Sequence, residues 1–403
     1  MKILIITPTY YPYIIGGGEY STQYVAEGLA KLGHDVWVYS LGLENEKKVI
    51  NGVHIIREYM PESSEYYFTR IKGTANEVIQ TKNIYKIMHK QIDLMYSPRI
   101  YKKFKSMIST IKPDCLHSVS ALSYMGRYNI WKAAYDLNVP VSHVARSPEL
   151  VYFNFAQGKL DGLYRRFSRK SFKYVSYFAA PTNYILQLHN KYGIAAPTQT
   201  VIKNCVRNID IIDDQDIFDI KENRIIYAGD IREEKGIKTL LKSFHSLSDS
   251  ELLIIGEGKI SEILESQDLI HNDKVQNRIR ILPWLPQEEL FSIMKKSKVV
   301  VLPSEWEEAF GRVLIESIFN GTIAIGSDRG GIPEVLHYDN RFLFKSKSSD
   351  ELTKKLTWIL EMCKNEYNST LKDQQVWLGE YNYEHYIKKW SDFFTMQIGE
   401  KQL

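Results

Sequence analysis

The chain has 403 residues, of which 44% are hydrophobic and 25% are charged, and its formal net charge is +4. This length exceeds what one hydrophobic core supports, so two domains of about 200 residues each are expected. So small a net charge does not indicate a nucleic-acid partner. Three cysteines lie far apart without metal-ligand spacing, which indicates a reducing compartment, and no apolar run approaches the roughly 18 residues of a membrane span.

The first predicted elements are a strand at residues 3–7, a helix at residues 19–32 and a strand at residues 36–40, which together form a βαβ unit. The loop before the helix ends in Gly16, Gly17 and Gly18. Glycines at a strand-to-helix turn let the backbone approach a ligand closely. The other interpretation of this triplet is a merely flexible loop.

Two basic stretches follow in the first half of the chain. Residues 60–105 combine lysines with many tyrosines and are interpreted either as solvated helix faces or as a variable acceptor-side region. Residues 159–173 predict a helix with basic residues around one apolar face, formed by Leu160, Leu163, Tyr164, Phe167 and Tyr174. This pattern fits an ordinary core-packed helix, and it also fits a helix that lies on an anionic membrane surface.

Further strands are predicted at residues 114–117 and 139–144. Apolar periodicity then lapses at residues 207–222, which indicates an interdomain linker. Asp214 and Asp216 in this linker are interpreted as solvated charge rather than as metal ligands. A strand at residues 224–228, a glycine-containing loop and a helix to about residue 247 begin the second half.

The most informative stretch is residues 299–335, which predicts a strand, an acidic loop, a helix that starts near Gly311 and another strand. Glu308 lies in the loop and Glu316 on the second turn of the helix, so both carboxylates are expected to face one crevice. The amides at the helix N-terminus between them suit an anion. Sugar hydroxyls, a ribose diol and a diphosphate fit such a site, and a solvated acidic helix start is the alternative.

This stretch resembles the donor-binding signature of family-4 retaining glycosyltransferases with the GT-B architecture. It has a Pro-Ser pair, E-x-FG, two Glu separated by seven residues, NG after the helix and a GG-x-PE turn at Gly330, Gly331, Pro333 and Glu334. The start of the chain resembles the opening of the same family at Gly16, Gly17, Glu19, Gly33, His34 and Val36. Several fixed elements within about 35 residues are more specific than any single motif.

The resemblance implies an α/β fold of the GT-B type, with two doubly wound Rossmann-like domains that face a central cleft. Residues 1–206 would form the acceptor-side domain and residues 207–379 the nucleotide-sugar domain. A C-terminal helix at about residues 380–403 carries many aromatic residues. By the resemblance, it would cross back and pack on the first domain.

The resemblance also implies roles for single residues. Glu316 would accept hydrogen bonds from the ribose hydroxyls, and Glu308 would contact the donor sugar. Negative charge develops on a departing nucleoside diphosphate. The groups expected to hold it are Lys235, Arg232 and the amides of Phe310, Gly311 and Arg312.

The remaining expected positions border the nucleotide, the phosphates and the acceptor: Gly229, Pro283, Gly16, Gly17 and Gly18. The chain departs from the family pattern at Asp230, where the family has Arg. It departs again at Arg146, which stands where the family has His. Either Arg146 takes that role, with a permanent charge that would neutralise the leaving phosphate, or the role is dispensable. The nearby His143 is interpreted as a core histidine.

The predicted function is that of a retaining hexosyltransferase that moves a sugar from a UDP- or GDP-sugar to a glycan or lipid-linked acceptor in bacterial surface-polysaccharide synthesis. The expected location is the cytoplasm, including the inner face of the membrane through peripheral contact with anionic lipid. No metal cofactor and no nucleic acid are expected. The alternatives are a non-catalytic sugar-nucleotide-binding subunit and a GT-B epimerase; a phosphorylase is disfavoured because no pyridoxal-binding Lys context is evident.

Overall fold

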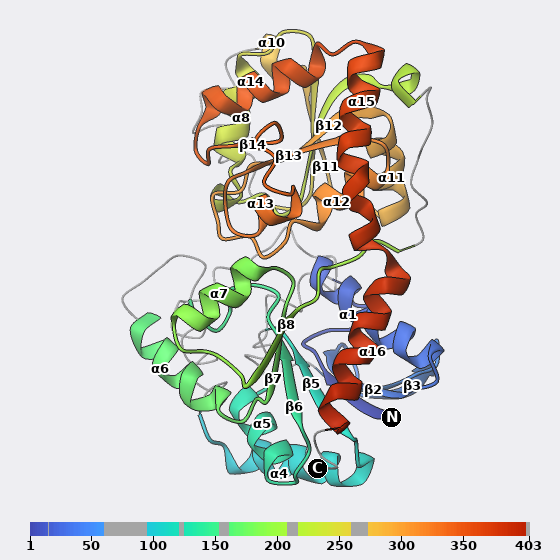
Figure 1. The fold of residues 1–403 in the computed structure, drawn as a ribbon, viewed down its shortest axis with the longest axis vertical. Helices are drawn as coiled ribbons and strands as arrows, with labels where there is room; N and C mark the ends of the chain where they lie inside the picture. The colour runs from blue at the N-terminus through green and yellow to red at the C-terminus, as the bar shows by residue number, and fades with distance from the viewer. Residues whose placement is uncertain are drawn as a thin grey trace. The chain divides into compact units, whose positions relative to one another are not determined.

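The computed structural model describes residues 1–14, 16–59, 95–120, 125–152, 161–207, 217–258 and 273–399. The chain divides into two compact units (Figure 1). The first unit comprises Met1–Lys203 together with Glu384–Leu403, and the second comprises Asn204–Tyr383. The first unit is therefore built from both ends of the described chain.

The first unit contains an eight-stranded sheet in the order β3-β4-β2-β1-β5-β6-β7-β8, in which only the β3–β4 pair is antiparallel. Its strands are β1 (Lys2–Ile6), β2 (Asp35–Gly42), β3 (Glu46–Ile50), β4 (Val53–Tyr59), β5 (Cys115–Val119), β6 (Val141–Val144), β7 (Tyr177–Ala180) and β8 (Thr198–Val201). The β3–β4 hairpin is absent from the predicted elements. Asn51 and Gly52 form its turn with positive φ, as an Asn-Gly pair commonly does.

One face of this sheet is covered by α1 (Gly17–Lys31) and α16 (Tyr383–Gly399). His117 and Tyr177 share a face because both pair in register with Ser142. The His117 ring lies 5.1 Å from the ring of Trp390 on α16. The helix predicted at the C-terminus thus supplies part of the first unit's core.

The opposite face is covered by α4 (Pro98–Ile111), α5 (Arg127–Tyr135), α6 (Asp161–Phe172) and α7 (Asn183–Lys191). His143 and Phe178 are register partners in the next row of side chains, which faces the other way. The His143 ring lies 5.3 Å from Trp131 on α5, and the Phe178 ring lies 5.2 Å from Phe172 on α6. The sheet is therefore buried between two helical layers.

The second unit contains six parallel strands in the order β11-β10-β9-β12-β13-β14. They are β9 (Glu222–Ala228), β10 (Glu251–Ile255), β11 (Ile279–Leu282), β12 (Ser297–Leu302), β13 (Ile323–Ser327) and β14 (Leu343–Phe344). The strand order reverses between β9 and β12. In doubly wound sheets, ligands bind outside the carboxyl ends of the strands at such a reversal.

The helices of the second unit are α8 (Ile237–His245), α10 (Asp273–Gln276), α11 (Gln287–Lys295), α12 (Arg312–Phe319), α13 (Ile332–Val335), α14 (Ser349–Leu360) and α15 (Lys364–Gln375), with short 3₁₀ turns at η2 (Ile217–Ile220), η3 (Glu233–Lys235) and η5 (Val376–Tyr381). No helix in the described residues is both long and apolar enough to cross a bilayer.

We predict opposite effects for two Gly-to-Ala substitutions in helices. A Cβ on Gly28 of α1 would lie 2.5 Å from Ile387 of α16, whereas a Cβ on Gly162 of α6 would meet no atom within 4 Å. Gly28→Ala should lower the free energy of unfolding by about 1–3 kcal/mol through overpacking. Gly162→Ala should raise it by about 0.5 kcal/mol through helix propensity. Urea unfolding checks both, and equal shifts would contradict the α1–α16 contact.

Candidate active site

The loops after β9 and β12 touch each other at the strand-order reversal. Gly236, at the end of the β9 loop, has φ +77°, and a Cβ there would lie 1.8 Å from the carbonyl oxygen of Pro303. The backbone N–H of Glu305 donates to the carbonyl of Glu234 at 2.9 Å, and the Thr239 hydroxyl donates to the Glu305 carboxylate at 2.8 Å. Glycine at residue 236 is what allows this approach.

Lys235 and Glu308 form an ion pair across this contact. The Lys235 Nζ donates to Glu308 Oε1 at 2.5 Å, and both side chains are largely buried. Two of the predicted site residues, which lie 73 positions apart in the chain, are therefore brought into direct contact. A charge pair that is shielded from water interacts more strongly than one on an exposed surface.

The backbone of Glu308 is held by the Gly330-Gly331 turn. The N–H of Gly331 donates to the carbonyl of Glu308 at 2.7 Å. Gly330 has φ +60°, and a Cβ there would lie 2.4 Å from the Glu308 nitrogen. This turn therefore fixes the position from which the Glu308 side chain reaches Lys235.

Glu316 is held on α12 by two neighbours. Arg312 donates from Nη2 to Glu316 Oε1 at 2.8 Å, one turn away on the same helix. Gln287 on α11 donates to the same oxygen at 3.4 Å. The helix begins at Arg312 after Gly311, which has φ +87°, in agreement with the predicted start.

Arg232 lies between two carboxylates of its own loop. Its guanidinium is 3.4 Å from Asp230 Oδ2 and 3.1 Å from Glu234 Oε1. On the loop after β12, burial raises the pKa of the Glu307 carboxyl, and the charge of Arg329 opposes that rise.

Gly229 and Pro283 border the same edge of the sheet. Gly229 follows β9 and donates its N–H to Ile255, the last residue of β10, at 2.9 Å. Pro283 follows β11, and the carbonyl of Leu282 just before it accepts from Gly256 at 3.0 Å. Both predicted residues thus lie at carboxyl ends of parallel strands.

In the first unit, the glycine loop closes on Glu19. The Gly16 N–H donates to Glu19 Oε2 at 3.1 Å. A Cβ on Gly18 would meet no atom within 4 Å, so packing does not require glycine there. Burial raises the pKa of Glu19, and the charge of Arg146 is among the interactions that oppose the rise.

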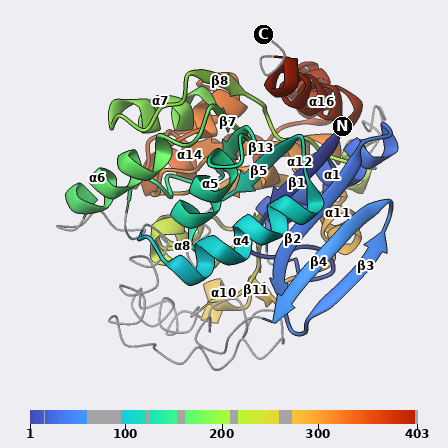
Figure 2. The ribbon, with the colours of Figure 1, turned by 90° about the horizontal axis from the view of Figure 1, so that it is seen from below.

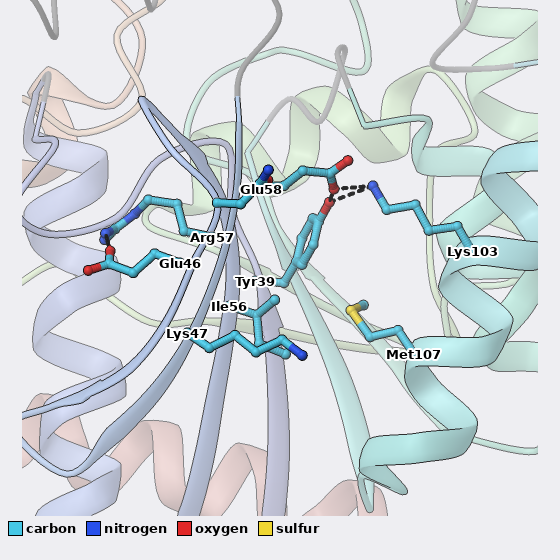
Figure 3. Close-up of a pocket in the computed structure, with 9 residues that line it drawn as sticks. Tyr39, Glu46, Lys47, Ile56, Arg57, Glu58, Lys103 and Met107 are labelled. Atoms are coloured by element: carbon cyan, nitrogen blue, oxygen red, sulfur yellow. Dashed lines mark hydrogen bonds and ion pairs between the residues drawn. The ribbon is translucent and has the colours of Figure 1, made fainter.

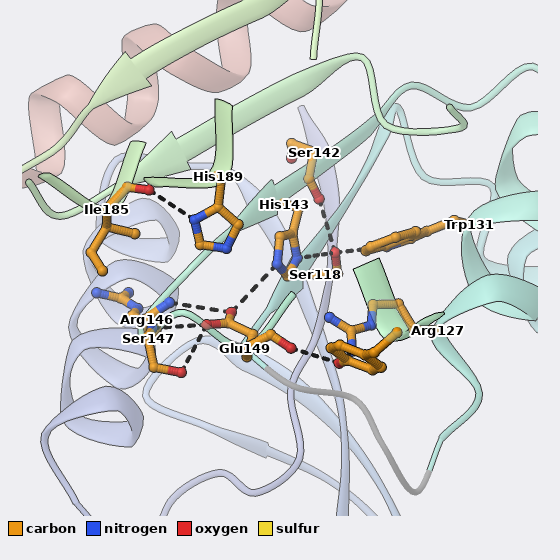
Figure 4. Close-up of polar contacts among 11 residues, drawn as sticks. Ser118, Arg127, Trp131, Ser142, His143, Arg146, Ser147, Glu149, Ile185 and His189 are labelled. Carbon is orange, nitrogen blue, oxygen red and sulfur yellow. Dashed lines mark hydrogen bonds and ion pairs between the residues drawn. The ribbon is translucent and has the colours of Figure 1, made fainter. Parts of the chain in front are cut away.

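Glu149, which was not among the predicted site residues, organises the loop that carries Arg146 (Figure 4). Its buried carboxylate accepts from the N–H and the hydroxyl of Ser147, both at 2.8 Å, and from the N–H of Arg146 at 3.3 Å. Burial raises the pKa of Glu149, but the neighbouring His143 and His189 and a backbone hydrogen bond together outweigh it, and the pKa is lowered. The Ser-Pro-Glu spacing was the available signal, since a carboxylate two residues on can cap a serine turn.

His143 is a core residue, as interpreted from the sequence. It is fully buried on β6, its Nδ1 lies 2.9 Å from the Ser118 hydroxyl and its Nε2 lies 3.6 Å from Glu149. His189 is equally buried, and its Nδ1 donates to the carbonyl of Ile185 at 2.8 Å. Burial lowers the pKa of His143, and it lowers that of His189 to about 4.

A cavity of about 470 Å³ lies elsewhere in the first unit, between the β2–β4–β3 edge and α4 (Figure 3). Lys103 donates to the Tyr39 hydroxyl at 2.8 Å and pairs with Glu58, which also accepts from Tyr39. Arg57 pairs with Glu46 and donates to a backbone carbonyl. The charged side chains that line the cavity are thus largely paired with one another. None of the predicted site residues lines this cavity.

Metal-ligating side chains do not cluster in the described residues. No group of three or more His, Cys, Asp or Glu residues there could hold a metal ion. Asp214 and Asp216, which the sequence analysis interpreted as solvated, lie outside the described residues.

Two family models account for nearly the whole chain. The model for Glycosyltransferase Family 4 matches residues 15–207, and the model for Glycosyl transferases group 1 matches residues 208–384. The chain belongs to the family-4, group 1 glycosyltransferases. This glycosyltransferase also resembles an uncharacterised 42.6 kDa protein in the cps region of Klebsiella pneumoniae, with 29% identity over 357 residues, which cover 83% of this chain and 87% of that protein.

Solved structures show the fold. Sucrose-phosphate synthase from Thermosynechococcus elongatus matches with a TM-score of 0.74 and 14% identity over 99% of both chains. Anabaena HepE in complex with UDP and glucose matches with a TM-score of 0.70 and 13% identity, over 98% of this chain and 99% of that chain. The predicted GT-B fold and the predicted glycosyltransferase class are both confirmed.

We predict that Gly330→Ala disturbs the Lys235–Glu308 pair. The added methyl group would collide with the Glu308 backbone, and alanine is strained at φ +60°. The expected cost is about 1–3 kcal/mol of stability, measured by urea unfolding. Gly379→Ala in the same unit is the control, because a Cβ there would meet no atom within 4 Å. Equal stability of the two variants would contradict the close approach of Gly330 to the Glu308 backbone.

We also predict acid sensitivity from the buried histidines. Because the folded pKa of His189 is lowered to about 4, the unfolded chain binds protons first as pH falls below about 6.5. Stability should therefore decline by up to about 3 kcal/mol between pH 6.5 and 4. His189→Asn, which retains a donor for Ile185, should show a shallower decline in thermal unfolding measured against pH. An unchanged slope would contradict this prediction.

Proposed function

We propose that this glycosyltransferase transfers a sugar from a nucleotide diphospho-sugar, with a UDP-sugar as the first candidate, to a glycan or lipid-linked acceptor with retention of anomeric configuration. The observation that carries the proposal is the Lys235–Glu308 contact at the strand-order reversal of the second unit. It brings an ammonium and a carboxylate together at the edge where doubly wound sheets bind nucleotides, which supports a donor site there.

The proposed donor site divides the ligand into three parts. Glu316, oriented by Arg312 and Gln287, would accept from the ribose hydroxyls. Glu308 would contact the donor sugar. Lys235 and Arg232 would hold the diphosphate together with the amides of residues 310–312, since cations and helix N-terminal amides both stabilise phosphate charge.

The Lys235–Glu308 pair has a direct consequence for donor binding. A diphosphate that recruits the Lys235 ammonium would release Glu308 Oε1 from its 2.5 Å contact. The carboxylate could then accept hydrogen bonds from sugar hydroxyls. In place of their contact with each other, Lys235 would bind the diphosphate and Glu308 would bind the sugar.

Arg146 is proposed to neutralise the leaving phosphate from the first unit. Its backbone is held by Glu149. A guanidinium stays charged at physiological pH and can bind phosphate through two hydrogen bonds. This permanent charge would replace the His of the usual family pattern.

The proposed reaction requires no protein nucleophile. The bond from the anomeric carbon to the diphosphate oxygen breaks, and the acceptor oxygen bonds to that carbon on the same face. The acceptor proton passes to the departing phosphate oxygen. Lys235 and Arg232 would stabilise the charge that develops there, so the proposal includes no metal.

The choice of donor and acceptor is supported by two of the similar proteins. Anabaena HepE was solved with UDP and glucose, which favours a UDP-sugar. The relative in the Klebsiella pneumoniae cps region favours surface-polysaccharide synthesis. We place the reaction in the cytoplasm, at the inner face of the membrane when the acceptor carries a lipid.

A non-catalytic sugar-nucleotide-binding subunit is the second candidate. The observation in its favour is that Asp230 stands at the family's usual Arg position and pairs with Arg232. Measuring binding and hydrolysis with a panel of UDP-, GDP- and other nucleotide sugars separates the two functions. Turnover of any donor supports the transferase, and binding without turnover supports the subunit.

We predict that Glu316→Gln lowers kcat/KM with the best donor of that panel by about tenfold to a hundredfold, because one charged hydrogen bond is lost. Glu289→Gln, at an exposed carboxylate on α11 outside the proposed site, is the matched control and should behave as the unmodified enzyme does. Kinetics of Glu316→Gln that equal those of the control would refute the ribose role.

A further inference from the structure

The first unit exposes large apolar side chains on α6, at the end of α5 and on the segment before α4. Their exposed fractions are high: Met95 57%, Tyr96 53%, Tyr135 56%, Leu163 54% and Phe167 41%. They belong to α6, the end of α5 and the segment that leads into α4, which lie next to one another on the sheet face opposite α16 (Figure 2). We call this surface, formed by described residues 95–112, 125–136 and 161–174, the α4–α6 face.

The side chains that α6 exposes differ from those that a core-packed helix with this sequence pattern would expose. The sequence pattern placed Leu163, Tyr164 and Phe167 on one apolar face. Of these, only Tyr164 is buried, and its hydroxyl donates to the carbonyl of Glu149 at 2.6 Å. Leu163 and Phe167 lie one helical turn apart on the solvent side, because burial follows Ser168, Ser171 and Phe172 instead.

Tyrosine rings connect the three helices. The Tyr128 ring on α5 lies 6.5 Å from Tyr96 and 5.6 Å from Tyr174, and Tyr174 lies 5.3 Å from Tyr135. Lys132 sits 5.4 Å above Tyr101, and Lys173 sits 4.9 Å above Tyr174. Apolar, aromatic and cationic groups are thus interleaved rather than separated.

The charge of this face is mainly positive. Its three segments hold twelve Lys and Arg residues, of which Arg127 is buried and Lys103 is paired with Glu58, against two acidic residues, Asp136 and Asp161. Asp161 is buried, and Asp136 is paired with Lys132 at 2.6 Å. Since the whole chain has a net charge of only +4, the positive charge is concentrated here.

We propose that the α4–α6 face docks on an anionic membrane surface. Basic side chains attract anionic headgroups, and exposed Leu and Phe gain free energy by entering the boundary of the acyl chains. Tyrosine is favoured at the same depth because its ring is apolar and its hydroxyl is polar. A nucleic acid would use the cations but would leave Leu163 and Phe167 in water.

The proposal deepens the proposed function by naming the surface that meets the membrane. It rests on the proposed function with a lipid-linked acceptor, because an enzyme that acts on a membrane-bound acceptor works at the lipid surface. The docking test itself requires neither donor nor acceptor. Failure of docking and failure of sugar transfer can therefore be told apart.

The test is co-sedimentation of the full chain with phosphatidylcholine vesicles and with vesicles in which a third of the lipid is phosphatidylglycerol. The unmodified protein should bind the anionic vesicles and not the neutral ones, and added salt should weaken binding. Arg166→Glu with Lys170→Glu should lower the partition coefficient at least twentyfold, since each basic residue near the headgroups contributes about fivefold. Leu163→Ala with Phe167→Ala should lower it about tenfold.

The opposite sheet face provides matched controls on α16 and α1. Lys388→Glu with Lys389→Glu makes the same charge change at exposed positions, and Leu32→Ala with Met396→Ala makes a similar apolar change. Neither control should alter vesicle binding. Thermal unfolding and UDP binding, measured on every variant, should remain those of the unmodified protein.

Three results would overturn the proposal. The first is equal or absent binding to both kinds of vesicle by the unmodified protein. The second is a loss in the controls as large as that in the α4–α6 variants. The third is a loss on charge reversal but none on removal of Leu163 and Phe167, with binding to nucleic acid instead. Docking without binding of any nucleotide sugar in the donor panel would uphold this inference while refuting the proposed function.

Discussion

The second unit depends on contacts between backbones that only glycine permits. Gly236 lies against the carbonyl of Pro303, and Gly330 lies against the Glu308 peptide. Any side chain at either position would separate the loops at the carboxyl edge of the sheet. Because these loops touch, an ammonium from the β9 side meets a carboxylate from the β12 side at 2.5 Å, and both side chains are largely shielded from water. The donor-site hypothesis depends on this ion pair more than on any single side chain.

The sequence predicted those parts of the fold whose signals are local. Continuous apolar runs marked the buried strands β1 and β12, and the start of α12 followed from the helical apolar pattern that begins near Gly311. The β3–β4 hairpin was missed although Asn51-Gly52 marked it, because charged residues in β3 interrupted the apolar alternation. The helix α15 (Lys364–Gln375) has no counterpart among the predicted elements. On α6, helical periodicity gave the correct element but the wrong buried face.

The candidate site was predictable where motif and chain order coincide and unpredictable where distant segments meet. Glu308 and Glu316 lie on one short stretch, so their common edge could be inferred, whereas the approach of Lys235 to Glu308 depends on tertiary structure. Glu149 was missed because the groups that stabilise its charge come from β6 and α7 as well as from its own loop. In both units, loops after parallel strands carry the polar groups, but the first unit buries its acid among histidines. That difference gives the first unit its expected sensitivity to acid.

The placement of α16 has a consequence for how the chain is made. Trp390, Phe393 and Phe394 fill the layer against His117 and Tyr177, yet they are translated after every residue of the second unit. While the ribosome is still synthesising residues 204–383, one side of the first sheet lacks this cover. The nascent amino-terminal half must therefore wait, with apolar surface open to chaperones, until the last helix emerges. Folding of the first unit is thereby coupled to the order of synthesis.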